Sequence, residues 1–161
     1  NNDDDDDDKQ QQQPITLQIR VLSGSCLPKP DGATVGECID PYVTITIHDV
    51  MKKKENDDDD HYDTIYTTSS KSIQRIDDNG YCPIFTSEEK KLSEFNIHTP
   101  DIASVEFTVR DMDIDSDDYV AFASIPFNCL RKGYRSIQLY DSHNTRSGPY
   151  AFATLLVEIN Y

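Results

Sequence analysis

Residues 105–121 read VEFTVRDMDIDSDDYVA, and this stretch decides how the chain folds. Apolar Val105, Phe107 and Val109 alternate with polar residues, which is the period of two expected of a strand with one buried face. Five aspartates then fall within eight residues, after which apolar sequence resumes at Val120. The sequence therefore predicts two strands joined by a short acidic loop.

Carboxylates crowded into such a loop repel one another unless water or a cation screens them. Calcium suits these groups, because it is a hard cation that takes about 6–8 oxygen ligands in a flexible geometry. Asp111 and Asp113 are separated by one residue at the end of a strand, so their side chains point to the same side. The loop is therefore a candidate calcium site.

Two other interpretations compete with a calcium site of this kind. An EF-hand loop also begins D-x-D-x-D, but its sixth and twelfth positions would here be Ser116 and Phe122 instead of Gly and Glu. The flanking sequence is also strand-like, so we reject the EF-hand. The second alternative is a solvated acidic loop, which stays open because the chain carries acidic runs elsewhere.

The charge of the chain limits its partners. A sequence of 161 residues suffices for one domain with a proper core, and its formal net charge is −15. Such a protein is not expected to bind nucleic acid through a basic face. Nor would it adhere to an anionic membrane by charge alone, unless a bound divalent cation reverses the local sign.

The four cysteines show no metal-binding spacing, and paired histidines are absent, so a zinc site is not expected. Buried or half-buried free thiols in a reducing compartment are the default expectation, although an even number leaves disulfides possible. No apolar run approaches the length of a membrane span.

Taken in order, the chain predicts an all-β domain behind a tail. Residues 1–14 form an acidic, Gln-rich stretch that we expect to be a disordered linker, and residues 15–161 form the domain, with a charged insertion at 51–63. One helical turn is expected at 128–132. About eight short strands point to an eight-stranded antiparallel β-sandwich, and they are predicted at 15–22, 40–50, 64–76, 84–97, 105–110, 119–126, 134–140 and 151–161.

Asp40 lies at the mouth of the second predicted strand, directly before Pro41 and after a long Gly- and Pro-rich loop. If that mouth lies on the same edge as Asp111, the two loops together form a metal cup with two parts.

Aspartates in two strand-connecting loops resemble a C2 domain. The segments IDPYV at 39–43, DMD at 111–113 and DYV at 118–120 carry the resemblance. It extends through SIPFNCLRKGYRSIQLYD at 124–141 and ATLLVEI at 153–159, which are similar to the C2 domain that closes phosphoinositide-specific phospholipase C enzymes. One strand before the Asp40 loop and one added at the end resemble the phospholipase-type strand order.

The resemblance implies which residues gather at one end of the sandwich. Asp40 would come from the first loop and Asp111, Asp113 and Asp118 from the third, as calcium ligands. Asp115 and Asp117 are additional acids that would serve a second ion, and Asp31 is a weak candidate.

The sequence departs from the family pattern at three positions near this end. Cys82 stands in the second loop where relatives often have Asn, Phe85 stands in place of a Trp, and Ala121 stands in place of a Gly. Cys82 is a poor calcium ligand, so one ion position would be weakened or lost.

The resemblance implies a calcium-dependent module that binds an anionic phospholipid surface. It would dock a phosphoinositide phospholipase C, which hydrolyses phosphatidylinositol 4,5-bisphosphate to diacylglycerol and inositol trisphosphate, at the cytoplasmic, inner face of a membrane. The alternative is a calcium-independent C2 domain that packs against the catalytic domain of its parent chain. Catalysis by this segment is rejected, because its histidines are scattered at His48, His61, His98 and His143.

Overall fold

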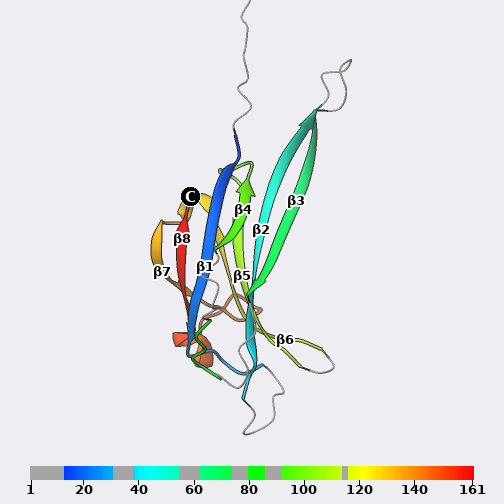
Figure 1. Ribbon diagram of the computed structural model, residues 1–161. Helices are drawn as coiled ribbons and strands as arrows, with labels where there is room; N and C mark the ends of the chain where they lie inside the picture. The colour runs from blue at the N-terminus through cyan, green and yellow to red at the C-terminus, as the bar shows by residue number, and fades with distance from the viewer. Residues whose placement is uncertain (1–12, 31–37, 55–61, 74–79, 86–91, 114–115) are drawn as a thin grey trace, which may run out of the picture.

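The computed structural model describes residues 13–30, 38–54, 62–73, 80–85, 92–113 and 116–161. Most of the predicted linker, residues 1–12, lies outside this part. The described residues form eight strands and two short 3-10 helices (Figure 1). In chain order these are β1 (Ile15–Ser25), β2 (Pro41–Lys54), β3 (Tyr62–Ile73), β4 (Ser93–Ile97), β5 (Ser104–Asp111), β6 (Asp118–Pro126), η1 (Phe127–Cys129), β7 (Gly133–Gln138), η2 (Gly148–Phe152) and β8 (Thr154–Asn160).

The strands form two four-stranded antiparallel sheets, which confirms the predicted sandwich and its strand order. The first sheet has the order β4-β1-β8-β7, and the second has the order β3-β2-β5-β6. The first and last strands are neighbours, paired from Gln18 opposite Asn160 to Ser25 opposite Thr154. This pairing is the phospholipase-type order that the sequence resemblance implies.

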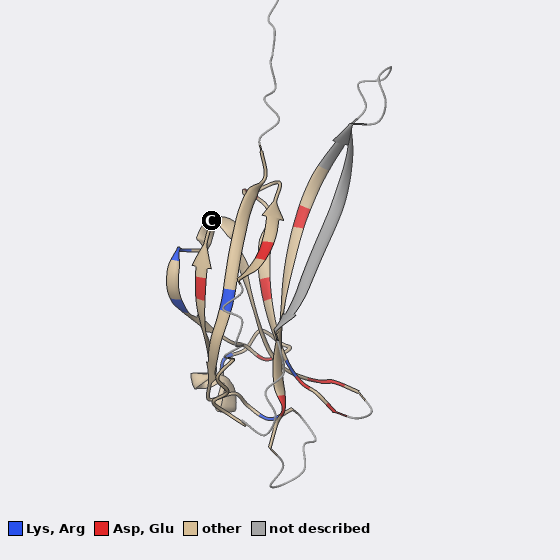
Figure 2. Cartoon of the chain, in the orientation of Figure 1, with Lys and Arg blue, Asp and Glu red and all other residues tan. Residues whose placement is uncertain are grey.

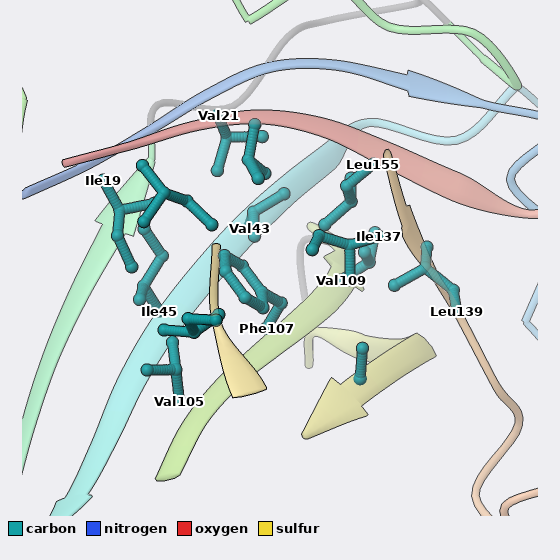
Figure 3. Packing of buried hydrophobic residues seen from close by; sticks show 14 of the residues in the cluster. Ile19, Val21, Val43, Ile45, Val105, Phe107, Val109, Ile137, Leu139 and Leu155 are labelled. Atoms are coloured by element: carbon teal, nitrogen blue, oxygen red, sulfur yellow. The ribbon is translucent and has the colours of Figure 1, made fainter. Parts of the chain in front are cut away.

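One hydrophobic cluster fills the space between the sheets (Figure 3). Ile19, Val21 and Leu155 project into it from the first sheet, and Val43 and Phe107 project from the second (Figure 3). All five are at most 1% exposed. The period-two pattern read from the sequence produces this core, because alternate side chains of each strand face the opposite sheet.

The structure differs from the sequence expectations in several places. Among the described residues of the strand predicted at 84–97, only Ser93–Ile97 form β4. The helical turn predicted at 128–132 is the 3-10 helix η1 at Phe127–Cys129. β2 continues to Lys54 and β3 begins at Tyr62, so their hairpin extends into the predicted charged insertion, of which residues 55–61 lie outside the described part. Helix η2 was not predicted. All four cysteines are free thiols, as expected, but they are exposed, which corrects the expectation of burial.

The loops divide between the two ends of the sandwich. β1, β3, β5 and β7 end, and β2, β4, β6 and β8 begin, towards one end of the sandwich (Figure 1). We call it the acidic end because Asp40, Asp111, Asp113 and Asp118 lie there, and Figure 2 shows acidic residues at this end. The start of β1 and the end of β8 lie at the other end. Among the helices of the described chain, none has the length and apolar content needed to cross a lipid bilayer.

Candidate metal and membrane site

Asp40 and Asp111 are brought together at the acidic end by the β2–β5 pair. The register places Pro41 opposite Asp111, so the residue before β2 meets the last residue of β5. The backbone N–H of Asp40 donates to Oδ1 of Asp111 at 2.6 Å, and the N–H of Met112 donates to the Asp40 carbonyl at 3.2 Å. The two loops therefore share one edge, which is the condition stated from the sequence for a cup with two parts.

Asp111 and Asp118 are cross-strand partners at the mouth of the β5–β6 hairpin. Asp111 is only 4% exposed, whereas Asp113 and Asp118 are exposed to solvent. Asp115, the fifth predicted ligand, lies outside the described residues. Thus four of the five predicted residues gather at one end, on two loops.

Their chemistry suits a hard cation, because carboxylate oxygens are the ligands that calcium takes. Their arrangement is less complete. Within the described ranges, no group of three or more His, Cys, Asp or Glu side chains converges closely enough to hold a metal ion. Oδ1 of Asp111 is also already engaged by the N–H of Asp40. Calcium also takes backbone carbonyl and water oxygens, so three side-chain ligands among the described residues are not a condition for binding it.

A row of three large polar residues crosses the second sheet beside the aspartates. Tyr42 pairs with Arg110, and Arg110 pairs with Tyr119 across a register shift in β5–β6. The Tyr42 hydroxyl donates to Oδ2 of Asp117 at 2.6 Å. Partial burial, followed by this carboxylate, raises the pKa of Tyr42, while the nearby Arg110 lowers it. Asp117 is therefore anchored to β2.

The loop at 80–85 lies against the end of β1. The N–H of Gly24 donates to the Pro83 carbonyl at 2.9 Å, and the N–H of Leu27 donates to the Tyr81 carbonyl at 2.8 Å. Cys82 lies between these two hydrogen bonds with its side chain exposed. The substitution noted in the sequence thus lies at the acidic end, on a loop that β1 holds in place.

The segment 141–152 packs beside the β5–β6 hairpin. The strand predicted at 151–161 begins only at Thr154, because residues 151 and 152 belong to helix η2. Asp141 accepts hydrogen bonds from the hydroxyl and the N–H of Thr145 and from the N–H of His143, and these lower the pKa of Asp141. The Tyr150 hydroxyl donates to the Val120 carbonyl at 3.1 Å. An Asp followed by Ser, His, Asn and Thr is a recognisable side-chain-stabilised turn, so this turn had a sequence signal.

A half-open hollow of about 340 Å³ separates this segment from the start of β6. Its walls are largely polar, and they are formed by Pro30, Asp118, Tyr119, Asp141, Ser142, His143 and Tyr150. Asp118 therefore contributes both to the candidate metal site and to the wall of this hollow. No sequence pattern indicated it, because its walls come from four separate parts of the chain.

Comparison with known proteins agrees with the geometry. The family profile of the C2 domain matches residues 15–142. The chain is 35% identical over 127 residues to human "Inactive phospholipase C-like protein 1", covering 78% of the chain and 10% of that protein. It is 31% identical over 149 residues to rat "1-phosphatidylinositol 4,5-bisphosphate phosphodiesterase delta-1", covering 92% of the chain and 17% of that enzyme. The chain thus spans less than a fifth of the length of either relative.

Solved structures share the fold at lower sequence identity. A C2 domain of plant Extended Synaptotagmin 1 aligns with a TM-score of 0.60 and 15% identity, over 92% of this chain and 95% of that one. A three-domain structure of Extended-Synaptotagmin 2 aligns with a TM-score of 0.60 and 17% identity, over 94% of this chain and 28% of that one. The family profile and the sandwich together establish that this chain belongs to the C2 domain family.

Proposed function

We propose that this C2 domain binds calcium at its acidic end and thereby docks a phospholipase C-type parent protein on an anionic phospholipid membrane. One observation carries the proposal. The N–H of Asp40 is hydrogen-bonded to Asp111 at the joined ends of β2 and β5, with Asp113 and Asp118 exposed on the adjoining loop. The similarity to the rat phosphodiesterase supports this kind of parent.

Without a bound cation, the acidic end repels an anionic surface. Calcium, when bound, supplies positive charge and open coordination positions for lipid oxygens. Asp40 and Asp111 hold the two loops in register, and Asp113, Asp115 and Asp118 supply further oxygens. The domain would then be peripheral at the cytoplasmic face of a membrane.

A second candidate function is calcium-independent packing against a catalytic domain of the parent. Two observations favour it: the described side chains lack a ready-made group of three metal ligands, and one relative is named an inactive phospholipase C-like protein. The two functions differ in whether calcium changes the behaviour of the chain.

Calcium titration by calorimetry, paired with sedimentation on phosphatidylserine vesicles, separates them. We expect heat of binding and sedimentation that requires calcium. In Asp111→Asn with Asp113→Asn, calcium affinity should fall at least about tenfold, because two anionic ligands are lost. The calcium-free fold should survive or gain stability as repulsion is relieved.

Two controls make the titration decisive. Asp113→Asn with Asp118→Asn changes only exposed residues, so it tests the site even if the buried Asp111 cannot be replaced. Asp101→Asn alters an exposed acid on the β4–β5 turn at the other end and should leave calcium binding unchanged. Unaltered calcium affinity in both double variants would rule out this site. If the wild-type chain gives no heat of binding and does not sediment with vesicles, the packing function is favoured.

A further inference from the structure

Four of the eight exposed large hydrophobic side chains of the described residues lie at the acidic end. Among the described residues, the most exposed large hydrophobic side chain is Phe152, at 76%. Tyr81, Ile84 and Met112 are also exposed, on the neighbouring loops at the same end. Single exposed apolar residues are common on protein surfaces and need no explanation. Here, however, they lie at the same end of the sandwich as the candidate calcium ligands, so they would face any surface that this end approaches.

Phe152 lies at the end of helix η2, which hydrogen bonds attach to both sheets. Helix η2 is attached to the second sheet by the hydrogen bond from the Tyr150 hydroxyl to the Val120 carbonyl. It is attached to the first sheet by the Gln138 side chain, whose Nε2 donates to the carbonyls of Tyr150 at 3.3 Å and Ala153 at 2.8 Å. The exposure of Phe152 therefore comes from a turn held on both sides.

A cation lies directly beside this aromatic residue. Nη2 of the exposed Arg146 donates to the carbonyl of Ala151 at 3.2 Å. Because Ala151 directly precedes Phe152, the guanidinium lies close to the backbone of Phe152. An aromatic ring with an adjacent cation is the composition that favours the interface of an anionic bilayer. The ring enters the headgroup layer, and the guanidinium meets a phosphate.

We propose that Arg146 and Phe152 form a second contact with an anionic phospholipid surface, alongside the calcium loops. This inference rests on the proposed membrane docking. The β5–β6 loop belongs to one sheet, and η2 leads into the other. Contact through both fixes the tilt of the sandwich on the membrane, which a single loop cannot do.

The chain contains no tryptophan, so Phe152→Trp introduces a single fluorescent reporter. The probe is the full chain with calcium and vesicles of phosphatidylcholine and phosphatidylserine that carry brominated acyl chains. We expect the tryptophan emission of this variant to shift to the blue and to be quenched on binding. Ile102→Trp is the matched control, because Ile102 is 62% exposed on the turn at the opposite end and its replacement should show neither change.

Affinity measurements test the same contact without a label. Phe152→Ala should weaken vesicle binding about tenfold or more, from the apolar area lost. Arg146→Gln should weaken it about fivefold, and Arg146→Lys should restore most of the loss, because the charge is what matters. Ile102→Ala should bind as the wild-type chain does, and calcium binding without vesicles should stay unchanged in all four variants.

The outcomes separate the two proposals. Calcium-dependent sedimentation, with unquenched emission from Phe152→Trp and unchanged affinity of Phe152→Ala, would overturn this inference and leave the docking function standing. It would point instead to a protein partner over η2. A wild-type chain that never sediments with calcium would overturn both proposals. Quenching in Phe152→Trp but not in Ile102→Trp, with weakened binding of Phe152→Ala, would establish the contact.

Discussion

Tyr119 carries a hydroxyl that the fold encloses, and it finds no hydrogen-bond partner among the described residues. Burial, with smaller contributions from Tyr150 and Asp141, raises its pKa from 10.0 to about 12. In the unfolded chain the phenol loses its proton near pH 10, whereas in the folded chain it keeps the proton until about pH 12. Stability from this residue is therefore complete below pH 10 and is lost as pH rises towards 12.

We expect Tyr119→Phe to reduce the loss of stability between about pH 10 and about pH 12, measured by urea unfolding at each pH. At neutral pH the variant should be as stable as the wild-type chain or more so, since it removes a polar group without a partner. A loss of more than about 1 kcal/mol at neutral pH would show that the hydroxyl is hydrogen-bonded.

At the scale of elements, one buried carboxylate fastens the turn that carries the chain from one sheet to the other. Asp49, near the far end of β2, is 3% exposed and accepts hydrogen bonds from the backbone N–H groups of Val50, His98 and Thr99. The Thr99 hydroxyl in turn donates to the Val50 carbonyl. The β4–β5 turn is thus tied to β2 by a side chain instead of a strand ladder.

Asp49→Ala should lower the free energy of unfolding by about 2–4 kcal/mol, because it leaves buried N–H groups without acceptors. Asp49→Asn should cost less, since the amide keeps one oxygen. The control is Asp101→Ala on the same turn, whose exposed side chain should change stability by no more than about 0.5 kcal/mol. Equal stability of the two alanine variants in urea would contradict this account of the turn.

A clean period of two was the most direct signal for the strands predicted from sequence alone. β1, β5 and β8 follow such alternation, and their inward residues form the core. The same signal fails in the β2–β3 hairpin, where backbone hydrogen bonds continue the ladder through charged sequence without regard to side chains. Helix η2 was missed because five residues are too few to show a helical period.

The whole sandwich depends on a single cluster shared by both sheets. Phe107 is fully buried at its centre, among residues of β1, β2 and β8 (Figure 3). Phe107→Ala should cost about 3–5 kcal/mol, from the apolar area lost and the cavity left behind. Hydrogen exchange should show protection falling together in β1 and β5, as one cooperative unit requires. Phe152→Ala, which changes an exposed ring, is the control and should leave exchange unchanged.

At the same scale, the candidate site was only partly accessible from sequence. The link between Asp40 and Asp111 was anticipated as a condition, because both residues border predicted strands. The contact from Tyr42 to Asp117 and the position of Tyr150 against Val120 were not anticipated. They depend on register and on how two sheets meet, and neither leaves a local pattern in the chain.

The pairing of β1 with β8 also determines how the domain responds to mechanical load. The two strands run in opposite directions, with Gln18 opposite Asn160 at the end away from the aspartates. Tension between the start of β1 and the end of β8 falls first on that outermost pair, then on the next, so the strands peel apart one pair at a time. Tension between these ends and the acidic end runs along the strands and strains many hydrogen bonds at once. The domain therefore resists force weakly when it is pulled between the start of β1 and the end of β8. It resists force strongly when it is pulled between these strand ends and a ligand bound at the acidic end.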